Sequence, residues 1–166
     1  MRLVIDASVL KAAGSEAAEA ECSRRCREFL SAVLRICHQI VGTAETHEEW
    51  KWHKSPYASG WLTEMVRRGK LHKVGQQERG IRRRIRALKD ASRIEPILKD
   101  IHLFEAAIAS NRIIISLDET AKNNLKYLIK LRAIKSQDIA WVNPSRDENL
   151  SEWLESGATE VKKFIL

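Results

Sequence analysis

Residues 98–125, LKDIHLFEAAIASNRIIISLDETAKNNL, decide the fold of this chain. The proline just upstream and apolar residues at helical spacing predict a helix over residues 98–110, with Asp100 in its first turn. The β-branched run at 113–117 predicts a strand buried on both faces, with Asp118 just past its end. Helix and strand each span on the order of 15 Å and the connection between them is short, so they should run antiparallel. We therefore expect Asp100 and Asp118 to lie close together.

Short apolar segments alternate with helical ones along the rest of the chain. This alternation predicts an α/β fold: a three-layer α/β/α sandwich around a central parallel sheet of about four to five strands, with right-handed crossovers. Besides the strand at 113–117, the segments expected to form strands are 3–5, 39–43 and 139–142.

Two further helices are expected outside this alternating core. Residues 76–91 predict a helix too polar to lie mainly in the core. Ser145 and Glu148 have the spacing of a capping box, which would open a last helix. The expected organisation is a main domain over residues 1–143, with a basic helical insertion at about 67–99, and a C-terminal helical appendage over 144–166.

The basic charge of the chain is local. Residues 67–99 hold twelve basic and three acidic residues, a net charge of +9, which leaves −2 of the total of +7 for the remainder. A local patch of this kind points to a polyanionic partner. No apolar run reaches the length of a membrane span, and no signal peptide precedes the first strand. We therefore expect a cytoplasmic protein with no membrane partner.

Acidic residues follow the ends of the expected strands. Asp6 follows the first strand, Glu45 the second and Asp118 the third, while Asp100 reaches the same edge from its helix. Ligands of parallel sheets bind outside the carboxyl ends of the strands. Each acid alone could be a helix cap or a partner of the helix dipole. Four carboxylates together would repel one another without a cation, and oxygen ligands of this kind suit Mg²⁺ or Mn²⁺.

Three segments together resemble a PIN domain, the fold of metal-dependent ribonucleases that include the VapC-type toxins of toxin–antitoxin pairs. The segments are LVIDASVL at 3–10, IVGTAETHEEW at 40–50 and DIHLFEAAIASNRIIISLDETA at 100–121. The resemblance implies catalytic acids at Asp6, Glu45, Asp100 and Asp118, with supporting hydroxyls at Ser8 and Ser116.

The resemblance implies a divalent-metal-dependent endoribonuclease that hydrolyses RNA phosphodiester bonds, with the toxin of a toxin–antitoxin pair as one possible role. Asp6, Asp100 and Asp118 would hold Mg²⁺ or Mn²⁺, and water activated there would attack the phosphorus. Glu48 and Glu49 lie one turn beyond Glu45, and either could be the second-strand acid in its place.

RNA, a second copy of the chain and an antitoxin are the expected partners. The family resemblance implies a homodimer surface or an antitoxin groove on the helices that carry Trp50, Trp52 and Trp61. Basic side chains spaced three and four apart on the 76–91 helix should form a ridge that contacts RNA phosphates, giving affinity but little sequence information. The residues expected to bind RNA are Arg79, Arg82, Arg83 and Arg86.

Two further hypotheses fit parts of the pattern. A non-catalytic RNA-binding module of the same fold would hold RNA on the basic helix and use the acids structurally. A receiver or phosphatase-type α/β domain also gathers acids at strand ends. That class commonly uses an adjacent acid pair, whereas Asp6 is followed by Ala7 and Ser8.

Overall fold

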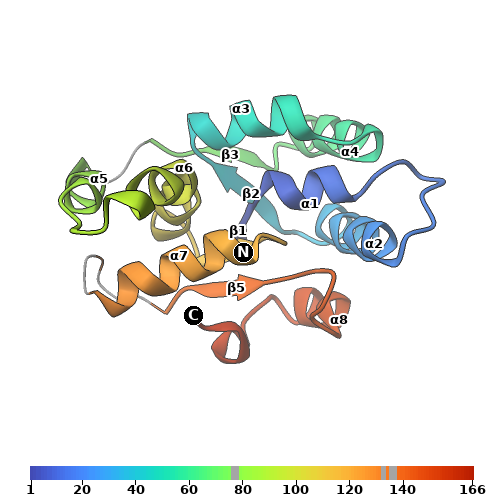
Figure 1. Ribbon diagram of the computed structural model, residues 1–166. Helices are drawn as coiled ribbons and strands as arrows, with labels where there is room; N and C mark the ends of the chain where they lie inside the picture. The colour runs from blue at the N-terminus through green and yellow to red at the C-terminus, as the bar shows by residue number, and fades with distance from the viewer. Residues whose placement is uncertain (76–78, 132–133, 135–137) are drawn as a thin grey trace.

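A parallel sheet in the strand order β3-β2-β1-β4-β5 forms the centre of the molecule (Figure 1). The structure is a computed structural model that describes residues 1–75, 79–131, 134 and 138–166. The predicted α/β/α class is confirmed, and β3 adds a fifth strand from within the basic segment. The strands are β1 (Arg2–Ile5), β2 (Gln39–Gly42), β3 (Leu71–Lys73), β4 (Ile113–Ile115) and β5 (Ala140–Val142).

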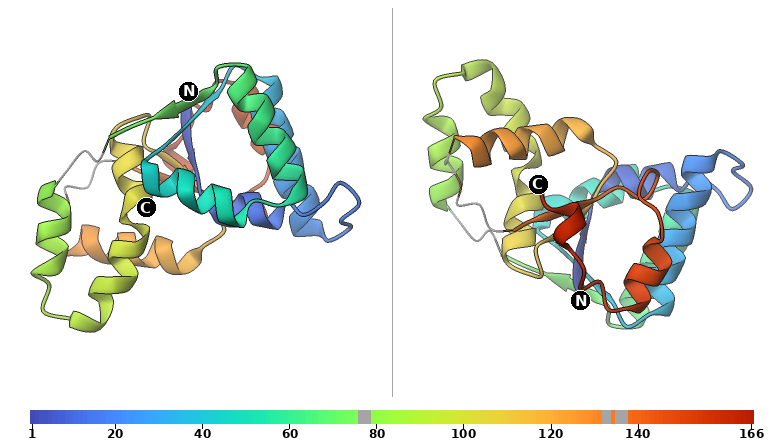
Figure 2. Two further views of the ribbon diagram at one scale, coloured as in Figure 1. Left: turned by 90° about the horizontal axis from the view of Figure 1, so that it is seen from above. Right: turned by 90° about the horizontal axis from the view of Figure 1, so that it is seen from below.

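Helices cover both faces of the sheet, because successive strand side chains point to opposite faces. Leu3 and Ile5 of β1 enter one core, and Val4 between them enters the other. Figure 2 shows the two helical layers on opposite sides of the strands. The first core is closed mainly by α1 (Ala7–Ala12), α2 (Glu21–Arg35), α4 (Pro56–Arg67) and α8 (Leu150–Glu155), with Trp50 of α3 (Ala44–His53). The second is closed by α5 (Arg79–Arg86), α6 (Ala91–Ile108) and α7 (Glu119–Lys130). None of the helices in the described ranges is long and apolar enough to cross a membrane.

The strand register brings two predicted site residues together. Ile5 pairs with Ile115 in the parallel ladder of β1 and β4. The backbone N–H of Asp6 then donates to the carbonyl oxygen of Ile115 at 2.9 Å. Asp6 and Ser116 therefore lie side by side, just beyond the carboxyl edge of the sheet.

Helix α6 begins at Ala91 rather than at residue 98, so the predicted start was wrong. Pro96 lies inside the helix, where it has no N–H to donate to the carbonyl of Ser92, a solvent-exposed residue near the helix start. Burial of Ile97 in the second core favours continuing the helix through this region. Asp100 consequently lies in the middle of α6 and not in its first turn.

The predicted helix over residues 76–91 is shorter in the structure. Residues 76–78 lie outside the described residues, α5 ends at Arg86, and α6 begins a few residues later. Its apolar residues Ile81 and Ile85 are 2% and 0% exposed. They attach α5 to the second core.

The capping box predicted at Ser145 and Glu148 is wrong. Helix α8 begins at Leu150 after Asn149, which has a left-handed backbone with φ of 56°. Ser145 Oγ instead donates to Oδ1 of Asn143 at 3.0 Å, because a local turn after β5 uses its hydroxyl. Trp153 and Leu154 of α8 lie in the first core. The short 3₁₀ helix η1 (Lys162–Phe164) follows α8 near the C-terminus.

Candidate functional site

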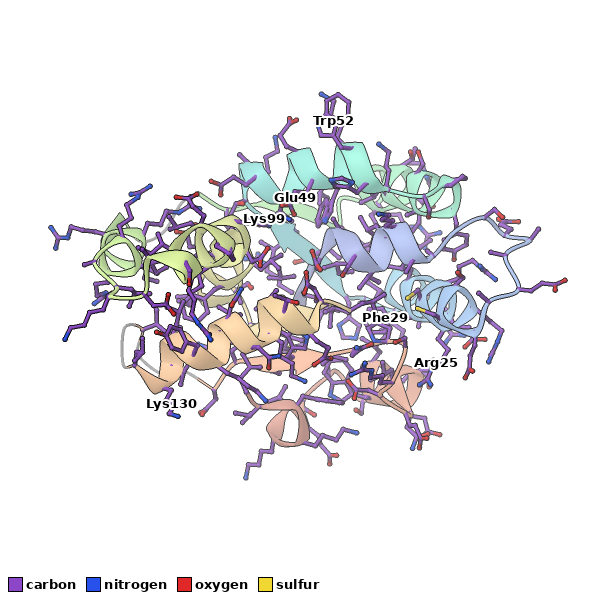
Figure 3. The ribbon with its side chains drawn as sticks, viewed as in Figure 1. Arg25, Phe29, Glu49, Trp52, Lys99 and Lys130 are labelled. Carbon is purple, nitrogen blue, oxygen red and sulfur yellow. The ribbon has the colours of Figure 1, made fainter. Side chains whose placement is uncertain are left out.

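A small cavity lies at the carboxyl edge of the sheet, where α1, α3, α6 and the start of α7 meet. Its volume is about 190 Å³. Figure 3 shows Glu49 of α3 and Lys99 of α6 near each other at this place. Polar side chains from four segments line it: Asp6, Ser8, Lys11, Glu49, His53, Lys99, Asp100 and Asp118.

Two hydroxyls hold the carboxylate of Asp6. Ser116 Oγ donates to Asp6 Oδ2 at 2.6 Å, and Ser8 Oγ donates to the same oxygen. Asp6 is 7% exposed. It precedes α1 at the N-cap position, yet in the described structure its side chain makes no capping hydrogen bond. Capping therefore does not explain this acid, and the predicted supporting residues Ser8 and Ser116 do gather around it.

Asp118 caps α7 and also lines the cavity. Its Oδ1 accepts from the backbone N–H groups of Thr120 at 2.8 Å and Ala121 at 3.0 Å. Its own N–H donates to Ser116 Oγ at 3.0 Å. The cap and the neighbouring hydroxyl together fix the position of the carboxylate at the cavity.

Asp100 extends from the middle of α6 into the same cavity. Burial raises the pKa of its carboxyl from 3.8 to about 6, with the neighbouring charges of Asp118 and then Asp6 adding to the rise. Lys99 and His102 oppose the rise. Carboxylates raise one another's pKa only over short distances. The three acids predicted from distant parts of the sequence line the same cavity.

Glu45, the fourth predicted acid, is not among the residues that line the cavity. Arg82 donates to both of its oxygens, from Nη1 to Oε1 at 2.9 Å and from Nη2 to Oε2 at 2.8 Å. The same guanidinium binds Glu105 twice, at 2.8 and 2.7 Å. Glu105 is 1% exposed, and a carboxylate so buried needs a partner for its charge. Helix α5 thus neutralises the acid that the family resemblance placed in the site.

Glu49 lines the cavity instead. Its Oε2 lies 3.2 Å from Nε2 of His102, whose side chain is 3% exposed. Nδ1 of His102 lies 2.9 Å from the carbonyl oxygen of Lys99. Burial lowers the pKa of His102, whereas the Glu49 carboxylate and the Lys99 carbonyl raise it. Together the two contacts outweigh burial, so the pKa of His102 is raised above its usual value. Glu48, the remaining acid of this turn, lies on the surface with its Oε2 3.9 Å from Nζ of Lys51.

The structure departs from the predicted basic ridge on α5 at Arg82, one of its middle residues. Arg82 is not part of an exposed ridge: its side chain is 19% exposed and ion-paired to Glu45 and Glu105. Glu105 lies on α6, against which α5 packs, and Glu45 lies on α3. Arg83 and Arg86 are exposed, as expected for an RNA-binding surface. The side chain of Arg79 lies outside the described part of the chain.

The donor atoms of the cavity suit a hard divalent cation, which prefers carboxylate and hydroxyl oxygens. Across the described residues, however, no three His, Cys, Asp or Glu side chains are grouped tightly enough to coordinate one ion as they stand. Carboxylates that face one another repel, and the raised pKa of Asp100 reflects that repulsion as well as its burial. A cation would have to draw these side chains together.

Three basic residues at the cavity were missed by sequence reasoning: Lys11, His53 and Lys99. The position of Lys11 could have been predicted. It lies one helical turn beyond Ala7, the residue that follows Asp6, so Ala7 and Lys11 share one face of α1. Lys99 directly precedes Asp100. The position of His53 depends on how α3 packs, which no local pattern reveals.

The chain was compared with models of known protein families and with characterised proteins. Neither comparison gave a match.

Proposed function

We propose that this chain is a divalent-metal-dependent endoribonuclease of the PIN type, with Asp6, Asp100 and Asp118 as its acidic site. The observation that carries this proposal is the convergence of three carboxylates from separate segments in one cavity at the carboxyl edge of the sheet. Ligands of α/β sheets bind at this edge. The raised pKa of Asp100 supports close spacing of the three acids.

The three acids would hold Mg²⁺ or Mn²⁺, which when bound supplies Lewis acidity and lowers the pKa of water. The chain's own groups prepare the site. The hydroxyls of Ser8 and Ser116 hold the Asp6 carboxylate in one orientation, and the first turn of α7 holds Asp118.

RNA is the proposed substrate because cations accompany the acids. The acids alone would repel a phosphate backbone, but Lys11 and Lys99 line the same cavity. Arg83 and Arg86 of α5, and Lys89 just after it, are also exposed. Basic side chains of this kind contact phosphates without reading sequence.

The family resemblance also supports further proposals about partners. A homodimer and an antitoxin partner are proposed, together with a cytoplasmic location. Trp52 of α3 and Val66 of α4 are 71% and 58% exposed, and such large apolar side chains are available for a protein interface. Sedimentation at high micromolar concentration tests the dimer, and a monomer there would count against it.

Cleavage of a labelled RNA in Mn²⁺ tests the proposed activity. Asp6→Asn and Asp118→Asn should each lower the cleavage rate by about 100-fold or more, since the metal supplies several kcal/mol of transition-state stabilisation. Chelation with EDTA should abolish cleavage by the unaltered chain. Glu95→Gln, which changes an exposed acid of α6, is the matched control and should cleave normally.

Folding of each variant is checked by thermal unfolding. Activity that survives in either aspartate variant would remove that residue from the mechanism. RNA binding without cleavage would favour a non-catalytic RNA-binding module of the same fold. In that case Mn²⁺ should also fail to stabilise the chain, whereas at 100 times its Kd a bound ion adds about 2.7 kcal/mol.

A further inference from the structure

We infer that the side of α7 that carries Lys122, Lys126 and Lys130 binds single-stranded RNA and guides it to the cavity. We call this surface the α7 lysine face. The inference rests on the proposed function, because it gives the path by which the proposed substrate reaches the acids. It involves no bound metal, so RNA binding in a chelator can test it.

Helix α7 begins at the cavity. Asp118, which lines the cavity, is the N-cap of α7, and its carbonyl oxygen accepts from the backbone N–H of Lys122 at 3.1 Å. The first lysine therefore lies one helical turn from the acidic site. Figure 3 shows Lys130 at the other end of α7, away from Glu49 and Lys99 at the cavity. By contrast, none of the described residues of α5 lines the cavity.

The three lysines lie along one side of α7, because they are four residues apart in sequence. The opposite side, which includes Leu125 and Leu128, is buried in the second core. Lys126 and Lys130 are exposed, and Lys122 is half-buried. At about 1.5 Å per residue, successive lysines are about 6 Å apart along the helix axis. Successive phosphates of an extended single strand have a similar spacing, so one strand can place a phosphate at each lysine.

The charge of the α7 lysine face is not neutralised by acidic neighbours on the helix. Residues 120–131 hold three basic side chains and no acidic one, although the chain outside residues 67–99 has a net charge of −2. Glu119, the acid of the first turn, instead has its Oε1 3.3 Å from Nη1 of Arg146. Within the part of the chain that the structure describes, no ion pair involves the three lysines. Ion pairing therefore does not explain them as it explains Arg82.

Side chains, and not the helix N-terminus, must hold a phosphate on α7. The backbone N–H groups of Thr120 and Ala121 already donate to the Asp118 carboxylate. Helix α6 adds a further cation beside the lysines: the guanidinium of Arg93 lies 4.5 Å from the centroid of the Tyr127 ring. Asp90 pairs with Arg93 at 3.1 Å, so the lysines supply most of the charge of this surface.

A single strand suits this surface better than a duplex. The cavity has a volume of about 190 Å³, which is too small to admit a base-paired helix. Proteins that bind single strands without sequence preference commonly use a line of positive charge that follows the backbone. Duplex RNA is instead recognised largely across its wide minor groove. The α7 lysine face provides one line of charge that leads to the proposed site.

Binding of a short labelled single-stranded RNA in EDTA, measured by fluorescence anisotropy at a series of salt concentrations, tests the inference. Lys126→Gln/Lys130→Gln should lower the log–log salt slope by roughly 1.4, since each phosphate contact of a single strand contributes about 0.7. If the binding curves of variant and unaltered chain meet at about 1 M salt, this slope corresponds to an affinity loss of about 25-fold at about 0.1 M.

Two control variants separate this surface from total charge and from side-chain size. Arg24→Gln/Arg35→Gln removes the same charge from exposed positions on α2 and should leave the slope unchanged. Lys126→Arg/Lys130→Arg keeps the charge of the α7 lysine face and should retain the slope of the unaltered chain. Thermal unfolding in EDTA checks that each variant is folded.

Three results would overturn the inference. An unchanged slope in Lys126→Gln/Lys130→Gln would make the α7 lysine face a solvated surface or the site of another partner. An equal loss in the α2 control would show that total charge governs binding. A loss in Lys126→Arg/Lys130→Arg as large as in the glutamine variant would show that charge is not what this surface supplies.

Failure of this inference can be told apart from failure of the proposed function. If the slope falls as expected but the unaltered chain does not cleave RNA in Mn²⁺, the inference stands and the proposed activity fails. If the unaltered chain cleaves RNA and the glutamine variant keeps its slope, the inference fails and the proposed function stands. If the unaltered chain binds no RNA, both fail.

Discussion

Replacing Asp100 with Asn should stabilise the metal-free protein at neutral pH while removing its activity. The pKa of this carboxyl is raised from 3.8 to about 6, first by burial and then by Asp118 and Asp6. Above pH 6 the folded chain must hold the charged form against both effects. At about 1.36 kcal/mol for each pH unit between the two pKa values, the penalty is about 3 kcal/mol. Because Asp100 lines a cavity that is open to solvent, which weakens both effects, we expect a measured gain of about 1 to 3 kcal/mol.

The pH dependence has a definite sign. Between about pH 4 and pH 6 the folded state of the unaltered chain binds more protons at Asp100 than the unfolded state does. Stability contributed by this group is therefore present below pH 4 and lost as the pH rises through 6. Asp100→Asn cannot titrate, so its advantage should be largest above pH 6 and should shrink toward zero near pH 4.

Urea unfolding in EDTA at a series of pH values measures this effect. Glu95→Gln removes an exposed acid from the same helix and should change stability by less than about 0.5 kcal/mol at every pH. If Asp100→Asn is less stable than the unaltered chain at pH 7.5, or if its gain in stability stays the same as the pH is lowered to 4, the raised pKa of Asp100 is refuted. The same variant should lose Mn²⁺-dependent RNA cleavage, a trade of stability for function.

Three more changes test other parts of the structure. Arg82→Ala should lower the free energy of unfolding in urea by about 3 to 5 kcal/mol, because it leaves a buried carboxylate unpaired. The control Arg83→Ala should change it by less than about 0.5 kcal/mol. Equal effects of the two variants would contradict the ion-pair network. Ser116→Ala should cost about 1 to 3 kcal/mol by the same assay, since it removes a donor from the buried carboxylate of Asp6; no loss would mean that the hydroxyl does not support Asp6. Arg83→Gln combined with Arg86→Gln should weaken binding of unrelated RNAs equally and lower the log–log salt slope by roughly 0.7 to 0.9 for each lost phosphate contact, and an unchanged slope would place RNA elsewhere.

Much of the fold could be predicted because strands buried on both faces have a strong sequence signature. The isoleucine run of β4 alternates between two cores, and every residue of it is buried. Parallel strands then carry the acids that follow them to one edge, which is why Asp6 and Asp118 could be placed together from sequence. The start of α6 could not be predicted, because packing of Ile97 and its neighbours extended the helix through Pro96.

The positions of Glu45 and Glu49 show what a local sequence pattern cannot predict. Glu45 and Glu49 share one side of α3, so helical periodicity cannot choose between them. In the structure Glu45 is ion-paired with Arg82, which is far from it in sequence and which sequence reasoning placed on an exposed ridge. Long-range pairing of charged side chains has no signature in a single sequence.

Anomalous diffraction from crystals soaked in Mn²⁺ would test most directly whether these carboxylates form one metal site. We expect a strong peak inside the cavity, contacted by oxygens of Asp6 and Asp118, and we expect it to disappear in Asp118→Asn. A saturating soak that gives no peak among Asp6, Asp100 and Asp118, or a peak that persists unchanged in the variant, would contradict the proposed site.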